Sequence, residues 1–245
     1  MKVKSILVSQ PEPKVENSPF HTLAVKQKVK VDFRPFIHVE AVPTHEFRKE
    51  KVNPKDFKNV ILTSKNAVDN YFRVLEDMRI PVSNDIKYFC ISEAIAYYLQ
   101  KYVVYRKRKI YFGKQTMADL IPMLKKHKDD GFFFPTSDIL KPIIPETLEK
   151  HNINYTRAVL YRTVQSDLSD LTDVYYDILV FFSPEGIKSL FKNFPDFKQK
   201  DTRIATFGVT TTKAAEEAGL EINIQAPTPE FPSMTKAIEE YIKVA

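Results

Sequence analysis

The feature that most constrains the fold is a buried strand that runs directly into a helix, between residues 177 and 190. Five consecutive apolar residues, Ile178 to Phe182, are typical of a parallel strand that is covered on both faces. Ser183 follows as a candidate helix N-cap, Pro184 fits the first helical turn, and Glu185 suits the positive end of the helix dipole. Such a joint leaves backbone N–H groups pointing outward, where an anion can bind.

The same construction occurs earlier, with a strand at 60–62 and Ser64 as the candidate cap. A second pair of strand-to-helix segments, 87–96 and 203–215, follows the two joints at nearly equal distances. We interpret this as an internal duplication with a period too long for a solenoid, giving two α/β units that each present two such turns on one edge. Chance similarity between α/β segments is the alternative.

Composition indicates a protein with room for two cores. The chain has 245 residues, of which 43% are hydrophobic and 28% are charged, and this length suits two domains. No apolar run approaches the roughly 20 residues of a membrane span, and the N-terminal strand pattern is too short for a signal peptide. The one cysteine, Cys90, has no intrachain disulfide partner. We therefore expect a cytoplasmic protein without a membrane contact.

The net charge of +6 and the pI near 9.1 favour an acidic partner. The densest basic cluster is Arg106–Lys109, but no recognition helix, zinc finger or RNP pattern surrounds it. We therefore expect no nucleic-acid partner. An anionic small molecule accounts for the same charge.

The order of the segments predicts an α/β fold with two parallel-sheet domains, one discontinuous and one inserted, joined by a two-stranded β ladder. Alternating strands and helices fill residues 44–153, the inserted domain, in which Ser137 is expected to open a helix. Residues 1–33 and 166–245 form the discontinuous domain. The half-exposed patterns at 34–43 and 154–165 form the ladder, and 29–40 is expected to be one strand.

Common catalytic motifs are missing from the sequence. The five glycines never fall in a G-x-G-x-x-G spacing, and the histidines show no metal-ligand spacing. Cys90 is expected to be a packed core thiol. What remains is a set of hydroxyls at helix starts, which we interpret either as plain caps or as a shared site for a polycarboxylate beyond the strand ends. They are Thr63, Ser64, Ser92, Ser137, Ser183 and Thr210–Thr212.

Several segments, in order along the chain, resemble the uroporphyrinogen-III synthase family. They are Thr63–Val68, Phe134–Lys141 with Ile144-Pro145, Leu160–Val164, Phe181–Gly186, Phe207–Ala214 and Ala226–Pro229. Each segment is weak alone, but the ordered set covers most of the chain. The resemblance implies two α/β domains and a cofactor-free lyase that cyclises hydroxymethylbilane to uroporphyrinogen III, with inversion of the last pyrrole ring and loss of water. Independently of the resemblance, we expect a monomer without a metal site.

The resemblance also implies roles for individual residues. Tyr161 matches a family tyrosine proposed to assist departure of the hydroxyl as a general acid, although it could equally be a packing aromatic of the ladder. Substrate-contacting turns are implied at Thr63, Ser64, Ser92, Ser137, Lys141, Ser183, Gly186, Thr210 and Thr211.

The sequence also departs from the family pattern on the inserted domain. Asn66 stands where a basic residue is common, Ile95 where a threonine is common, and Glu93 adds a negative charge. The alternatives to an active synthase are a degenerate family copy and a non-catalytic two-domain protein that senses an anionic ligand.

Overall fold

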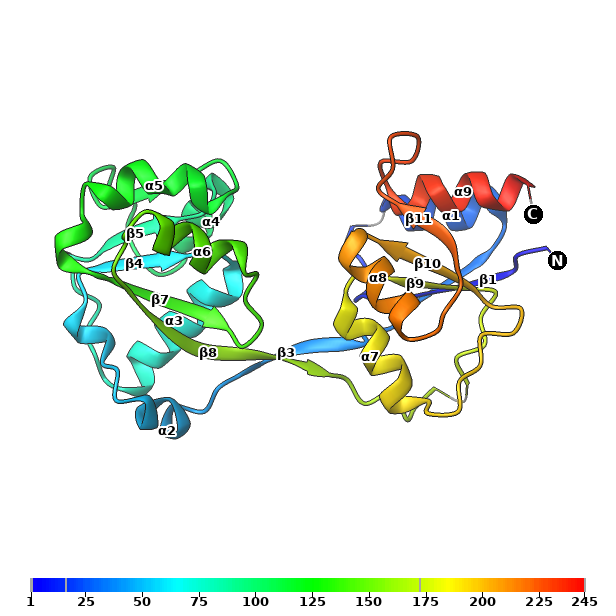
Figure 1. The fold of residues 1–245 in the computed structure, drawn as a ribbon, viewed down its shortest axis with the longest axis horizontal. Helices are drawn as coiled ribbons and strands as arrows, with labels where there is room; N and C mark the ends of the chain where they lie inside the picture. The colour runs from blue at the N-terminus through cyan, green and yellow to red at the C-terminus, as the bar shows by residue number, and fades with distance from the viewer. Residues whose placement is uncertain (1, 16, 172, 245) are drawn as a thin grey trace. The chain divides into compact units, whose positions relative to one another are not determined.

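The structure, a computed structural model, describes residues 2–15, 17–171 and 173–244. The chain divides into two compact units, unit 1 (Met1–His38 and Val164–Ala245) and unit 2 (Val39–Thr163) (Figure 1). One unit is discontinuous and the other is inserted, as the predicted fold class requires. The finer assignment of 34–43 and 154–165 to a separate connecting ladder stays a prediction.

Unit 1 contains a parallel sheet of five strands in the order β11-β10-β9-β1-β2. The strands are β1 (Ser5–Val8), β2 (Lys30–Phe33), β9 (Ile178–Phe181), β10 (Arg203–Phe207) and β11 (Ile222–Ala226), and the helices are α1 (Pro19–Gln27), α7 (Pro184–Asn193), α8 (Val209–Glu217) and α9 (Met234–Val244). Ile6 packs in the core beneath α1 and α9, whereas its neighbour Leu7 packs in the core beneath α7 and α8. Both faces of the sheet are therefore buried, which explains the continuous apolar strands.

Unit 2 contains six strands in the order β3-β8-β7-β4-β5-β6. The strands are β3 (Ile37–Ala41), β4 (Asn59–Leu62), β5 (Lys87–Cys90), β6 (Ile110–Phe112), β7 (Phe132–Ser137) and β8 (Tyr155–Gln165). The helices are α2 (Thr44–Phe47), α3 (Lys65–Asp77), α4 (Glu93–Leu99), α5 (Met117–Lys125) and α6 (Ile143–Lys150), with short 3₁₀ turns at Arg48–Glu50, Pro54–Asp56 and Lys128–Asp130. The helices α3 and α4 cover one face, and α5 and α6 cover the other.

The edge strand β3 pairs with β8. The Val42 N–H donates to the Leu160 carbonyl at 2.9 Å, and the Ser166 N–H donates to the Phe36 carbonyl at 2.9 Å. From Phe36 to Val42, on either side of β3, the partner moves backward from Ser166 to Leu160. The pair β3–β8 is therefore antiparallel, unlike the other pairs of the sheet.

The expectation of one strand over 29–40 was wrong. The chain forms β2 and β3 instead, with a break between Phe33 and Ile37. Pro35 lies in this break, where its missing N–H and fixed φ interrupt a ladder.

Apart from β3, the two sheets share one strand order. The order β2-β1-β9-β10-β11 in unit 1 corresponds to β8-β7-β4-β5-β6 in unit 2, as a duplication would give. In each sheet the direction of winding reverses at one point, between β1 and β9 in unit 1 and between β7 and β4 in unit 2. Open parallel sheets bind ligands beyond the carboxyl ends of the strands at such a switch point.

Candidate functional site

A cavity of about 610 Å³ lies at the switch point of unit 2. Residues at or just beyond the carboxyl ends of β4, β5 and β7 line it, and β8 contributes Tyr161. The lining residues are Thr63, Ile91, Gln115, Thr116, Met117, Ala118, Thr136, Ser137, Ile139, Leu140, Lys141, Ile143, Ile144, Thr147 and Tyr161. This volume is in the range of small-molecule sites. Four of the predicted site residues, Thr63, Ser137, Lys141 and Tyr161, therefore line one cavity.

Tyr161 is held by a hydrogen bond to the start of α3. Its hydroxyl lies 2.9 Å from the Ser64 Oγ. The Ser64 Oγ already accepts the Ala67 N–H at 3.0 Å, as the N-cap of α3. When Ser64 donates to Tyr161, the hydrogen of the phenol is left for a ligand in the cavity.

The Tyr161 side chain is 6% exposed. Burial raises the pKa of Tyr161 above its ordinary value, and the hydrogen bonds from Ser64 and Ser137 lower it only partly. The phenol is therefore protonated at neutral pH. It is a hydrogen-bond donor, and its conjugate base would have the Ser64 hydroxyl within hydrogen-bond distance.

The turn after β7 is fixed by its own polar groups. The Ser137 Oγ donates to the Asp138 carboxylate at 2.7 Å, and the Thr163 N–H donates to the same carboxylate oxygen at 3.1 Å. The Arg157 guanidinium donates to the carbonyls of Ser137 and Asp138, each at 2.9 Å. These bonds fix the backbone at Ser137, which is paired with Tyr161 in the β7–β8 ladder.

The expectation that Ser137 opens a helix was wrong. Ser137 ends strand β7, and the next helix, α6, begins at Ile143. The cause is Pro142, because a proline disfavours helical backbone at the preceding residue, Lys141. Lys141 consequently lies in the loop, where its exposed side chain is the one cation among the residues that line the cavity.

The start of α5 belongs to the cavity, although Thr116 was not among the predicted site residues. Thr116 and Asp119 form a full capping box. Hydrogen bonds from the N–H groups of Gln115 and Thr116 lower the pKa of Asp119 to about 2. The sequence contains a signal that identifies Thr116, because its capping box follows the strand at 110–112. Another helix therefore begins beyond the carboxyl ends of the same sheet.

Ser92 stands apart from this cavity. It occupies the N-cap position of α4, but its side chain makes no capping hydrogen bond. It is half-buried, beside the exposed Glu93. Ser92 does not line the cavity, although Ile91, one residue earlier, does.

The predicted residues of unit 1 occupy the equivalent edge of its sheet. Ser183 caps α7 by accepting the Gly186 N–H at 3.2 Å, and Gly186 is buried so that an added Cβ would lie 3.4 Å from Phe181. Thr210 is exposed in the first turn of α8, whereas Thr211 is 1% exposed and its N–H is bonded to the Gly208 carbonyl at 3.1 Å.

The structure describes Cys90 as a core residue. Its thiol is buried, and burial raises its pKa to about 12, so it is a poor nucleophile at neutral pH. Across the described ranges, no group of three or more His, Cys, Asp or Glu side chains could hold a metal ion. Among the same residues, every helix is too short or too polar to cross a membrane.

Comparisons with known proteins agree with one another. Residues 18–236 match the family model described as uroporphyrinogen-III synthase HemD. The uroporphyrinogen-III synthase of Chlorobaculum parvum is 25% identical over 76% of this chain and 80% of its own. The Saccharomyces cerevisiae enzyme is 27% identical, over half of each chain.

A solved structure supports the fold. The crystal structure of uroporphyrinogen-III synthetase from Helicobacter pylori aligns over 99% of this chain and all of that one, with a TM-score of 0.65 at 18% identity. The family model covers most of the chain, and the motifs that carried the resemblance lie within its span. The chain belongs to the uroporphyrinogen-III synthase family.

Proposed function

We propose that this protein is an active uroporphyrinogen-III synthase, which converts hydroxymethylbilane to uroporphyrinogen III and water. The observation that carries the proposal is the position of Tyr161 on the wall of the cavity of unit 2, with its hydroxyl 2.9 Å from the Ser64 Oγ. Family membership supports the reaction class, a cyclising lyase of tetrapyrrole biosynthesis.

The chemistry requires a proton donor at the start and a base at the end. The terminal hydroxyl of the bilane leaves as water once a proton is delivered to it, and an azafulvene remains. The substituted carbon of the last pyrrole ring attacks the azafulvene methylene carbon to give a spiro intermediate. The original bond from that ring carbon to the neighbouring methylene bridge then breaks, and the released methylene carbon bonds to the free α-carbon of the same ring, which is thereby inverted. Loss of a proton then gives the product. One water is lost overall, and the final proton restores the donor.

Tyr161 fits the donor role in this scheme. Its free hydrogen can bond to the departing hydroxyl, and Ser64 and Ser137 can stabilise the phenolate that forms. A raised pKa makes the phenol a weak acid, so we assign it a rate effect on the order of 10²-fold. The remaining acceleration comes from holding the flexible bilane in the geometry that favours the spiro route over direct closure.

The substrate carries eight carboxylates, which suits the net charge of +6. Lys141 and the first turn of α5 offer a cation and outward backbone N–H groups at the cavity of unit 2, and α3 begins two residues after Thr63, which lines the same cavity. We further propose Ser92, Ser183, Gly186 and Thr210 as contacts for the remaining carboxylates. Thr211, whose side chain is buried and whose N–H is bonded to the Gly208 carbonyl, would serve the site by fixing the first turn of α8. We also propose that the enzyme is monomeric and cytoplasmic and needs no cofactor.

The test is isomer analysis of the product. Freshly prepared hydroxymethylbilane is incubated with the protein, the product is oxidised to porphyrin, and the type I and type III isomers are separated. We expect type III to dominate with the native protein and type I with heat-denatured protein. Type I alone, formed at the rate seen without protein, would reject the enzyme and leave the ligand-sensing alternative.

A further inference from the structure

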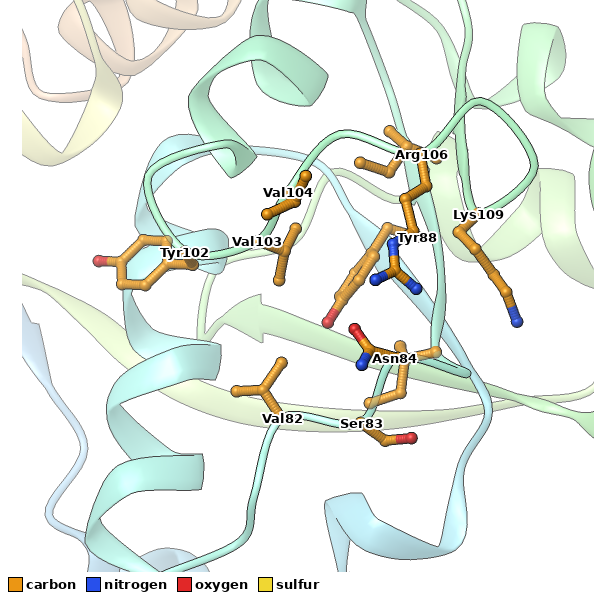
Figure 2. A pocket seen from close by; sticks show the side chains of 11 residues that line it. Val82, Ser83, Asn84, Tyr88, Tyr102, Val103, Val104, Arg106 and Lys109 are labelled. Carbon is orange, nitrogen blue, oxygen red and sulfur yellow. The ribbon is translucent and has the colours of Figure 1, made fainter.

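Unit 2 has a second cavity, at the opposite ends of its parallel strands from the cavity that Tyr161 lines. It has a volume of about 240 Å³ and lies where β5 and β6 begin, between the loops 79–86 and 100–109 (Figure 2). Valine and isoleucine side chains form much of its wall. The lining residues are Val82, Ser83, Asn84, Ile86, Tyr88, Tyr102, Val103, Val104, Arg106, Lys109 and Ile110.

Tyr88 brings an unsatisfied polar atom to this cavity. The residue is 3% exposed, and its hydroxyl is buried with no hydrogen-bond partner among the described residues. Figure 2 shows the hydroxyl end of the ring directed toward the space between Val103 and Asn84. A buried hydroxyl without a partner is unfavourable, and few such groups occur in a folded protein.

The Tyr88 ring itself is fixed by packing. Phe72 lies with its ring centroid 6.2 Å from Tyr88, and Phe72 is in turn stacked on Tyr102 at 4.3 Å. Burial raises the pKa of Tyr88, so the phenol stays protonated and offers a hydrogen to a ligand oxygen.

The rim of the cavity carries two cations in different situations. The Lys109 Nζ donates to the Asp85 carbonyl at 3.2 Å and lies 3.4 Å from its carboxylate. Arg106, in contrast, pairs with no acidic side chain of the described chain, and its guanidinium extends down toward the Tyr88 and Asn84 side of the cavity (Figure 2). A free guanidinium and an unpartnered phenol therefore offer hydrogen-bond donors around one space with apolar walls.

From this juxtaposition we propose that the cavity is a second ligand site, which takes a small organic carboxylate with an apolar body. The Arg106 guanidinium and the Tyr88 hydroxyl are donors for the carboxylate, and Val82, Val103 and Ile110 contact the apolar part. Drug-sized sites begin at about 300 Å³, so this cavity suits a ligand of about ten non-hydrogen atoms or fewer. The site does not depend on the proposed synthase reaction.

The test uses benzoate as the probe and its neutral isostere benzamide as the matched ligand. Binding is followed by the backbone amide resonances of the isotopically labelled full chain. We expect saturable shifts at Asn84 and Val103, little change at Ser64 and Ser137 in the other cavity, and a dissociation constant on the order of 1 mM. Benzamide should bind at least about five-fold more weakly, because it lacks the charge that Arg106 recognises.

Two variants and one control assign the binding to named atoms. Arg106→Gln should weaken benzoate binding about ten-fold, and Tyr88→Phe about five-fold. Arg108→Gln, which removes the same charge from the same loop outside the cavity, should leave the affinity unchanged. Equal binding of benzoate and benzamide, equal losses in Arg106→Gln and Arg108→Gln, or no saturable shifts at Asn84 and Val103 would each overturn the proposal. Arg106 is exposed, so its substitution should not disturb folding. The comparison of Arg106→Gln with Arg108→Gln therefore tests the proposal even if Tyr88→Phe does not fold.

Discussion

Tyr161→Phe is the substitution that tests the proposed mechanism at one atom. The ring remains, so packing in the core of unit 2 is kept, while the hydroxyl that is hydrogen-bonded to Ser64 is removed. If the phenol is the positioned proton donor, kcat should fall on the order of 10²-fold, which corresponds to about 2.7 kcal/mol in the activation barrier.

The same change should lower the free energy of unfolding by about 1 kcal/mol, because the Ser64 hydroxyl loses its hydrogen-bond partner.

The assay measures type III uroporphyrinogen formed from hydroxymethylbilane, with chemical denaturation run in parallel. Tyr71→Phe is the matched control, since Tyr71 is a fully buried tyrosine of the same unit whose hydroxyl has no partner among the described residues. Its loss should leave both activity and stability nearly unchanged. A Tyr161→Phe enzyme with kcat within about two-fold of the native value would refute the donor role and leave Tyr161 as a packing residue.

Two further substitutions and one thiol reagent test other features of the structure. Ser64→Ala should reduce activity and lower stability by about 1 kcal/mol, whereas Ser18→Ala, which removes an equivalent helix cap on α1, should lower stability alike without reducing activity. Burial raises the pKa of Asp177, but hydrogen bonds from the N–H groups of Lys4 and Ser5 outweigh it and lower the pKa overall. The Asp177 carboxylate should therefore stabilise the fold fully at pH values above its ordinary pKa of about 3.9, and this stabilisation should be lost as the pH falls through the lower pKa of the folded state. The difference in free energy of unfolding between the native protein and Asp177→Asn, measured by denaturation, should vanish in acid. Cys90 should react with iodoacetamide only after unfolding, and rapid labelling of the folded chain would contradict its buried position.

The elements that sequence reasoning predicted are those governed by local chemistry. Ser64 and Ser183 were predicted as helix caps and are caps, because the signal is a hydroxyl placed between a buried strand and a helical pattern. The capping box of Thr116 and Asp119 follows the same local rule.

The predicted helix and strand bounds were wrong where a proline interrupts the element that the surrounding residues predict. Pro142 delayed the helix expected at Ser137, and Pro35 divided the strand expected over 29–40.

The contact between Tyr161 and Ser64 could not be predicted from local pattern, since 97 residues separate them in the chain. Their proximity comes from the strand order of unit 2, in which β7 lies between β4 and β8. Thr116 joined the cavity for the same kind of reason. The sequence predicted which turns present polar groups, and the topology decides which of those turns share a cavity.

The most direct test of the central claim is to map where the octacarboxylate binds. Uroporphyrin III, the oxidised and stable form of the proposed product, can be titrated into the labelled protein while backbone amide shifts are recorded. We expect saturable shifts at Thr63, Ser64, Ser137 and Lys141, reduced in Tyr161→Phe. Saturable binding that leaves these amides unshifted would contradict the assignment of this cavity as the active site.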